Sequence, residues 1–227
     1  MAVFSSTFST TETPAELATF DGGLFVCGPA SWNRVLTAAG ACSPQDAAAY
    51  VAFRLATSSP GGTVGNEQYA KCTIAGIATN YWFGPAVRIQ GTGASQGQCY
   101  HVEVNQTTNF NVYKVTDGGS IGQTQLGSSI AVTPVNGDLI ELRATGTTTT
   151  TLKVFRNGSQ IGPDFTDSSS ALQNGQPGGW FFANAPALPQ MTDWEGGDLT
   201  TAIQTPELYQ SSNPQLAMWQ AFSVCSF

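Results

Sequence analysis

The stretch GDLIELRATGTTTTTLKVFRNGSQIG, residues 137–162, decides the fold. In its first part, residues 140, 142 and 144 alternate with residues 139, 141 and 143, and a period of two is typical of a β-strand with two different faces. Thr145–Thr151 predicts a loop that becomes strand near Thr150. Asn157-Gly158 predicts a tight hairpin, because both residues tolerate the positive φ that such a turn requires. The stretch therefore predicts consecutive antiparallel strands joined by short turns.

The segments that follow extend this pattern. A Gly-rich turn, Gln176–Gly179, precedes the aromatic run Trp180–Phe182, and DWEGGDL follows at Asp193–Leu199. This order resembles the concanavalin A-like, LamG-type jelly-roll family over about the second half of the chain. The matching residues are Gly137–Ile140, Leu152–Gly158, Asp167, Pro177–Gly179 and Asp193–Leu199. The resemblance implies an all-β fold, a jelly-roll sandwich of two antiparallel sheets, and a habit of binding glycans. It implies no enzyme activity, because a fold does not settle function.

Strand-like runs also recur before this stretch, at roughly ten-residue spacing and separated by turn residues, as in sandwiches and jelly rolls. They are Gly23–Cys27, Ala49–Ala56, Tyr69–Ile74, Ala86–Gln90, Cys99–Val104, Phe110–Val115 and Ser129–Val132. Helix is expected only as a single turn at Ser43–Ala49, where Ser precedes Pro.

The chain is expected to form one domain. Residues 1–204 make up the jelly roll, and residues 205–227 close it as a C-terminal strand or docking segment. In one interpretation Val3–Phe8 pairs with Ala217–Phe227, because the first and last strands of jelly rolls often lie side by side. In the other, the C-terminal segment is an arm that docks on a neighbouring subunit.

The composition restricts the function classes. Of 227 residues only 10% are charged, the net charge is −7 and the pI is about 4.4, which excludes a nucleic-acid surface. The eight Lys and Arg residues are scattered singly and are expected on the surface. The N-terminal residues lack the basic start and apolar run of a signal peptide, and no stretch is apolar enough for membrane insertion. These features suggest synthesis in the cytoplasm combined with a neutral, polar exterior.

The five cysteines form no C-x-x-C pair, so a zinc or redox site is not expected. Two interpretations stay open. The cysteines are small buried apolar residues, or one disulfide forms, either Cys27–Cys42 or Cys72–Cys99.

The only histidine lies in the strand-like run YHVEVN. Alternation places His101, Glu103 and Asn105 on one face, where His101 and Glu103 would lie within about 7 Å of each other. Such a pair could perform the general acid–base chemistry of a polysaccharide lyase or hydrolase. The glycosidase pattern E-x-D-x-x-E is absent, however, and the alternative is an ordinary solvent-facing strand of polar residues. All three residues are also candidates for binding a glycan.

Acidic residues gather in DWEGGDL. Asp193, Glu195 and Asp198 beside two glycines are candidate Ca²⁺ ligands, because Ca²⁺ prefers oxygen donors. Asp164 and Asp167 are further candidates. The alternative is a solvated acidic loop without metal.

The five tryptophans supply candidate sugar-stacking surfaces. Tyr81 and Trp82 belong to the densest aromatic group, and Trp194, between acids and glycines, is expected to be exposed. Trp180 is expected in the core. The alternative for any single tryptophan is core packing.

These observations favour a non-enzymatic module on the surface of a bacteriophage virion. It would be a capsid decoration, head-fibre or tail-fibre protein that acts in structure or adhesion, with other virion proteins or its own copies as partners, a homotrimer among them. Cell-surface glycans are expected as ligands. The alternatives are a stand-alone lectin-like domain with Ca²⁺, and the lyase or hydrolase built on His101 and Glu103. No cofactor other than Ca²⁺ is expected.

Overall fold

The computed structural model describes residues 3–12, 19–27, 35–38, 40–44, 49–58, 61–90, 98–105, 107–116, 122–183 and 189–199. These residues form sixteen β-strands. The first eight are β1 (Val3–Ser6), β2 (Thr19–Phe20), β3 (Phe25–Cys27), β4 (Val35–Ala38), β5 (Ala41–Pro44), β6 (Ala49–Leu55), β7 (Gln68–Ala75) and β8 (Tyr81–Ile89). The others are β9 (Cys99–Asn105), β10 (Asn109–Thr116), β11 (Gly122–Gln125), β12 (Leu139–Thr145), β13 (Thr150–Arg156), β14 (Ser159–Asp167), β15 (Gln176–Ala183) and β16 (Gln190–Asp198).

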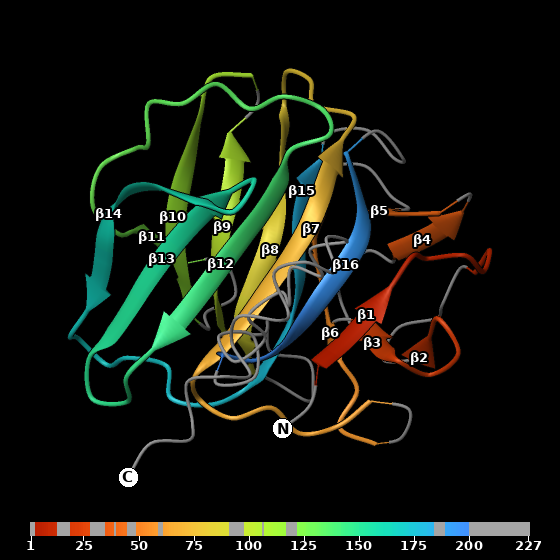
Figure 1. The fold of residues 1–227 in the computed structure, drawn as a ribbon, viewed down its shortest axis with the longest axis horizontal. Helices are drawn as coiled ribbons and strands as arrows, with labels where there is room; N and C mark the ends of the chain where they lie inside the picture. The colour runs from red at the N-terminus through yellow and green to blue at the C-terminus, as the bar shows by residue number, and fades with distance from the viewer. Residues whose placement is uncertain are drawn as a thin grey trace, which may run out of the picture.

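The strands form two antiparallel sheets that lie face to face (Figure 1). Sheet A has the order β14-β13-β12-β7-β16-β5-β4, with β1 paired to β16. Sheet B has the order β11-β10-β9-β8-β15-β6-β3-β2. The expected jelly-roll sandwich is therefore confirmed. Among the described residues, no helix has both the length and the apolar character that a membrane span requires.

The space between the sheets holds one continuous apolar core. It is rich in fully buried aromatic rings, such as Phe25, Phe53, Phe181 and Trp194. Burying a side chain of this size stabilises the fold by roughly 1.5–3 kcal/mol, so the sandwich depends mainly on these inner faces. The indole of Trp194 in sheet A also donates a hydrogen bond of 2.9 Å to the carbonyl of Gly178 in sheet B, which ties the two sheets together.

The local predictions for residues 137–162 are confirmed. Strands β12 and β13 pair in the expected order, and β13 begins at Thr150. The β13–β14 hairpin turns at Asn157 and Gly158, which have φ values of 52° and 82°. A turn with two positive φ angles matches the right-handed twist of its strands, which explains why this dipeptide was informative.

Two local predictions are wrong, and a third stays a prediction. Ser43 and Pro44 end strand β5 and do not begin a helical turn. Residues 129–132 form no strand and contribute only the bridge between Ile130 and Phe110. The N-terminal strand β1 pairs with β16, from Val3 opposite Gly197 to Ser6 opposite Trp194 (Figure 1). The expected partner of the N-terminal strand, Ala217–Phe227, lies outside the described residues.

Candidate functional site

The side of sheet B that faces away from sheet A carries the candidate site, and we call it the outer face. One line of four residues crosses it, one residue from each of four neighbouring strands. Phe182 of β15 lies opposite Trp82 of β8, Trp82 opposite Asn105 of β9, and Asn105 opposite Asn109 of β10. All four side chains are partly exposed. We call these four residues the amide–aromatic row.

Direct contacts hold the row together. The Trp82 indole donates a hydrogen bond of 2.8 Å to Asn105 Oδ1, and Asn105 Nδ2 donates one of 3.0 Å to Asn109 Oδ1. The rings of Trp82 and Phe182 lie 5.1 Å apart, tilted by 41°. The turn after β9 positions the amides, because the Thr108 backbone N–H and hydroxyl both donate to the Asn105 carbonyl. Each polar group of the row is thus oriented by its neighbour.

The other half of the outer face is apolar and buried. Its cluster comprises Ala86, Ile89, Cys99, Val115 and Trp180, with Ala52, Trp82 and Phe182 packed against it. Trp180 is therefore buried, as expected, but on the outer face and not between the sheets. Its ring stacks on His101 at 4.0 Å with an interplanar angle of 8°.

The alternation predicted for β9 is confirmed, because Tyr100, Val102 and Val104 face the core and His101 and Glu103 belong to the opposite face. The solvent-facing interpretation is wrong, since His101 is 0% and Glu103 5% exposed. His101 Nε2 lies 3.9 Å from Glu103 Oε2, and neither ring nitrogen has a hydrogen-bond partner among the described residues. Burial lowers the pKa of His101, although Glu103 partly opposes this shift. A neutral, enclosed imidazole in this position has no access to a substrate.

The stability of the protein should therefore depend on pH through His101. The unfolded chain takes up a proton near pH 6.5, whereas the folded chain does so only at lower pH, so the free energy of unfolding should fall as the pH drops below about 6.5. Denaturant unfolding at pH 7.5 and at pH 5.5, about one pH unit above and below that value, measures this slope. A His101→Gln variant should lose most of it, since the chain has no other histidine and Glu103 and Tyr113 are the facing titratable groups. An unchanged slope in the variant would show that the folded protein binds this proton as well as the unfolded chain does.

Two other aromatic candidates, Tyr81 and Trp194, are buried, whereas Trp82 is partly exposed. Tyr81 is only 7% exposed, so it contributes little accessible ring surface. Trp194 is 0% exposed and packs edge-on against Phe25 at 4.8 Å, so its expected exposure is wrong. The neighbouring glycine explains the error, because a Cβ on Gly196 would come within 2.7 Å of the Trp194 ring. Gly196 is thus needed for close packing of the ring and not for a flexible loop.

The predicted acidic loop is strand β16, and its carboxylates point to different partners. Glu195 accepts from Tyr69 at 2.6 Å and pairs with Lys71 at 2.9 Å, whereas Asp198 accepts from the Gly65 N–H at 2.7 Å. Asp193 is exposed. Within the described ranges, no three His, Cys, Asp or Glu side chains come together as a metal site. The geometry therefore does not fit Ca²⁺ at Asp193, Glu195 and Asp198.

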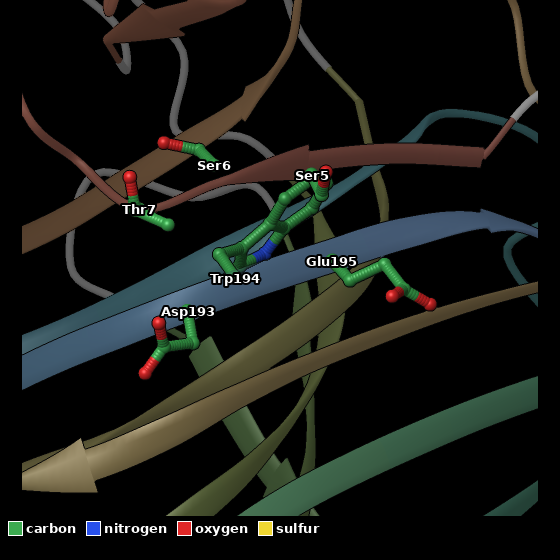
Figure 2. A pocket seen from close by; sticks show the side chains of 6 residues that line it. All are labelled: Ser5, Ser6, Thr7, Asp193, Trp194 and Glu195. Carbon is green, nitrogen blue, oxygen red and sulfur yellow. The ribbon is translucent and has the colours of Figure 1, made fainter.

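A hollow of about 440 Å³ lies between β1 and β16 (Figure 2). It is lined by Ser5, Ser6, Thr7, Asp193, Trp194 and Glu195. Its hydroxyl and carboxylate groups could form hydrogen bonds with a polar ligand. It offers no accessible aromatic face, however, because the Trp194 ring is fully buried. This separates the hollow from the amide–aromatic row.

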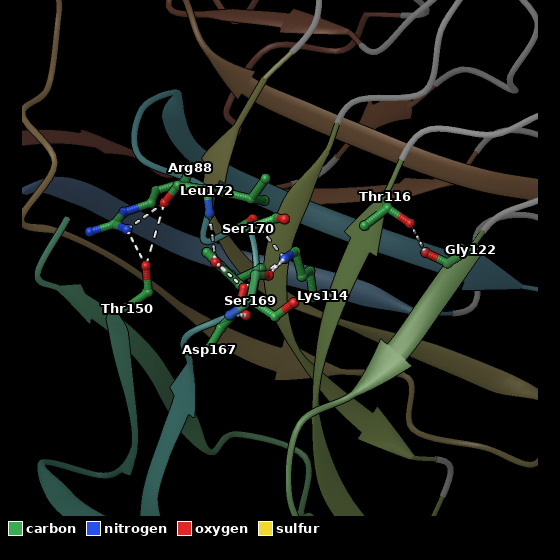
Figure 3. A network of polar contacts seen from close by, with 10 residues as sticks. Arg88, Lys114, Thr116, Gly122, Thr150, Asp167, Ser169, Ser170 and Leu172 are labelled. Carbon is green, nitrogen blue, oxygen red and sulfur yellow. Dashed lines mark hydrogen bonds and ion pairs between the residues drawn. The ribbon is translucent and has the colours of Figure 1, made fainter. Parts of the chain in front are cut away.

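A polar network that the sequence did not predict joins the sheets beneath the outer face (Figure 3). Arg88, 0% exposed, donates to Thr150 Oγ1 at 2.6 Å and to the carbonyls of Leu172, Asn66 and Gly146. Lys114, 7% exposed, pairs with Asp167 at 2.8 Å. The surface positions expected for Arg88 and Lys114 are wrong, because their partners lie far away in the sequence.

The other acidic candidates have structural partners as well. Asp167 also accepts from the Tyr100 hydroxyl at 2.7 Å. Burial opposes ionisation of Asp167, yet its bonds from Lys114, Tyr100 and Ser169 hold its pKa below the usual range. Asp164 pairs with Lys153 at the surface, at 3.2 Å. Within the part of the chain that the structure describes, neither carboxylate lies in a group of three possible metal ligands.

Cys72 and Cys99 are buried free thiols, so the Cys72–Cys99 disulfide is wrong. Burial raises the pKa of Cys99 to about 12, and it also raises the pKa of Cys72. Both residues therefore behave as small apolar side chains. The Cys27–Cys42 alternative involves the Cys27 side chain, which lies outside the described residues, as does Cys225.

No protein-family model and no curated protein matches the chain. Solved structures do match. One is a Bacillus subtilis protein of unknown function with a galectin-like fold, at 10% identity and a TM-score of 0.50, over 83% of this chain and 98% of that one. Another is a prokaryotic β-1,3-1,4-glucanase (lichenase) derived from a mouse hindgut metagenome, at 11% identity and a TM-score of 0.50, over 87% and 99%.

A third match is the CBM2 module of the evolved Dit protein of Lactobacillus casei BL23 phage J-1. Its identity is 13% and its TM-score 0.45, over 85% of this chain and 94% of that one. At such identities the likeness extends to the fold alone. The chain is thus an antiparallel jelly-roll sandwich of the kind found in galectin-like and glucanase structures.

Proposed function

We propose that this protein binds glycans through the amide–aromatic row and does not cleave them. The observation that carries the proposal is the row itself, in which a partly exposed indole and two amides form one line across four strands. A sugar combines an apolar ring face with a rim of hydroxyls. An aromatic ring can stack on the apolar ring face, while amides exchange hydrogen bonds with the hydroxyls.

The hydrogen bonds within the row leave capacity for a ligand. Asn105 uses its oxygen for Trp82 and one amide hydrogen for Asn109, so one hydrogen remains. Asn109 keeps both amide hydrogens among the contacts of the described residues. The exposed Thr107 and Thr108 lie beside it in the turn. The row therefore offers oriented donors next to an apolar surface, which is the usual composition of a small-ligand site.

Binding without cleavage is the better-supported mode. The acid–base pair that a lyase or hydrolase would need, His101 and Glu103, is buried, and the imidazole lies between Trp180 and Tyr113. A general acid or base must come within hydrogen-bond reach of the substrate. The closed position of His101 supports a role for this pair in packing.

The wider setting that we propose is the exterior of a bacteriophage particle, with other virion proteins or further copies of the chain as partners. The support is compositional, namely that only 10% of the residues are charged. Mass spectrometry of purified particles from a phage that encodes this chain tests the proposal. Absence of the protein from intact particles would contradict it.

Affinity electrophoresis through gels that contain bacterial or plant polysaccharides tests glycan binding. We expect at least one polysaccharide to retard the wild-type protein, and Trp82→Ala to weaken that binding about ten-fold. Phe155→Ala is the matched control, because Phe155 is also a partly exposed strand aromatic but belongs to sheet A. Equal retardation of wild type and Trp82→Ala would remove the row from the site. New reducing ends in the incubated polysaccharide would contradict binding without cleavage.

A further inference from the structure

The hydrogen bonds within the amide–aromatic row all run in one direction. An indole N–H can only donate, so the atom of Asn105 that lies 2.8 Å from Trp82 Nε1 must be its amide oxygen. This orientation turns Asn105 Nδ2 toward Asn109, and the atom of Asn109 at 3.0 Å from it must in turn be an oxygen. The single donor of Trp82 therefore fixes both amides, and the row ends at Asn109 Nδ2.

The row consequently offers donors in excess of acceptors. One hydrogen of Asn105 Nδ2 and both hydrogens of Asn109 Nδ2 have no partner among the described residues. Each of the two amide oxygens already accepts one hydrogen bond from its neighbour in the row. A ligand group that mainly accepts hydrogen bonds therefore matches the row better than a group that mainly donates them.

The nearest acidic side chain disfavours an anionic acceptor. Glu103 lies two positions before Asn105 in β9, on the same face of the strand, which corresponds to about 7 Å. The carboxylate or sulfate of an acidic sugar would be repelled by the Glu103 carboxylate at such a distance.

Among the residues that the structure describes, sheet B places no cation beside the row that could balance an anion. The Lys and Arg residues in its strands are Arg54, Arg88 and Lys114. Arg88 and Lys114 are buried and bonded to groups of sheet A. Arg54 lies four positions along β6 from Tyr50, which is opposite Phe182, so it is about 13 Å along the strand from the row. The acceptor that fits the row is therefore a neutral one.

A carbonyl fits these donors better than a hydroxyl does. A carbonyl oxygen accepts two hydrogen bonds and brings no hydrogen of its own, whereas a hydroxyl that accepts also brings a hydrogen that needs a partner. Among neutral sugar substituents, the acetamido group combines such a carbonyl with a methyl group. The methyl group can pack on the aromatic surface of Trp82 and Phe182, whose rings lie 5.1 Å apart at the other end of the row.

We propose that the amide–aromatic row binds glycans that contain N-acetylated amino sugars. The acetamido carbonyl accepts hydrogen bonds from the free amide hydrogens of Asn105 and Asn109, and the apolar parts of the sugar lie on Trp82 and Phe182. This inference rests on the proposed glycan binding and names the class of sugar for the same site.

Matched ligands that differ only in the acetamido group test the inference by isothermal titration calorimetry. One pair is tetraacetylchitotetraose and cellotetraose, and the other is the methyl α-glycosides of N-acetylgalactosamine and galactose. We expect the acetylated member of at least one pair to bind at least about ten-fold tighter than its hydroxyl counterpart. Equal or tighter binding of the hydroxyl member in both pairs, or no binding of either acetylated ligand, would overturn the inference.

Asn109→Asp tests the role of the terminal donors. The carboxylate can still accept from Asn105 Nδ2, but it has no amide hydrogen to donate. We expect the variant to bind the acetylated ligand at least about ten-fold more weakly. Gln125→Glu is the matched control, because it makes the same charge change at an exposed position of β11 and should bind like the wild type. Unchanged affinity of a folded Asn109→Asp variant, as judged by circular dichroism, would remove the amide donors from the inference.

Failure of this inference and failure of glycan binding give different results. If only the class of sugar is wrong, a polysaccharide without acetamido groups will retard the wild-type protein, and Trp82→Ala will weaken that binding. If glycan binding itself is wrong, no polysaccharide will retard the protein and neither acetylated ligand will bind.

Discussion

Replacing Trp194 with alanine is expected to lower the free energy of unfolding by about 3–5 kcal/mol, the usual cost of removing a large buried ring. The ring is 0% exposed, packs against Phe25, and lies so close to Gly196 that no Cβ fits there. The variant also loses the hydrogen bond to the Gly178 carbonyl that links the two sheets. Chemical denaturation followed by circular dichroism measures the change.

Trp82→Ala is the matched control, because Trp82 is partly exposed on the outer face. We expect it to cost less than about 2 kcal/mol, since less apolar surface leaves the folded state. Similar losses for the two variants would mean that Trp194 does not have the central position in the core described above. The same measurement establishes that the Trp82 variant used in binding assays is folded.

The second large effect is expected at the buried ion pair. Lys114→Met leaves Asp167 4% exposed without its cation, and we expect a loss of about 3 kcal/mol. The variant also removes the donor to the Ser169 and Ser170 carbonyls. Adding Asp167→Leu should recover part of the loss, because apolar residues in place of both charges leave no unpaired charge in the interior.

Lys153→Met is the control for this experiment. Its partner Asp164 is exposed, and exposed ion pairs contribute roughly 0–1 kcal/mol. Double-mutant analysis of positions 114 and 167 by denaturant unfolding gives the coupling energy. If the two substitutions were additive, the buried pair would contribute no interaction of its own.

Local signals in the sequence were sufficient for the strands, because their causes are local. The Asn157-Gly158 turn depends on the φ angles of two adjacent residues. The alternation at residues 99–105 depends on the pleat of one strand, and it correctly grouped His101 with Glu103. Neither pattern shows whether the side chains on the outer face of sheet B are exposed or buried.

The wrong predictions for Arg88, Lys114 and Trp194 have one physical cause, because the contacts that bury these side chains come from residues distant in the sequence. Lys114 is buried because Asp167 lies 53 positions later, and Arg88 because carbonyls at 66, 146 and 172 converge on it. Trp194 was expected at the surface because its acidic and glycine neighbours suggested a loop. Pairing of β16 with β7 and β1 makes that segment a strand. Such contacts depend on the register between strands. Alternation within one strand does not encode that register.

The amide–aromatic row was predicted in part. Trp82 and Asn105 were both candidates, but only the register of β8 with β9 places them in hydrogen-bond contact. Phe182 and Asn109 were missed. Phe182 lies near the end of β15, and Asn109 begins β10. The sequence does not show that these two strands lie on either side of β8 and β9, so neither residue could be assigned to the row.

An NMR titration shows directly whether a glycan contacts the amide–aromatic row. The ¹H–¹⁵N spectrum contains indole signals from five tryptophans and side-chain amide signals from the asparagines. Titration with an oligosaccharide cut from the retarding polysaccharide should shift the Trp82 indole and the Asn105 and Asn109 amides. The Trp194 indole, bonded to Gly178 in the core, should not move. Saturable binding that leaves the Trp82 and Asn105 signals unchanged would contradict the account.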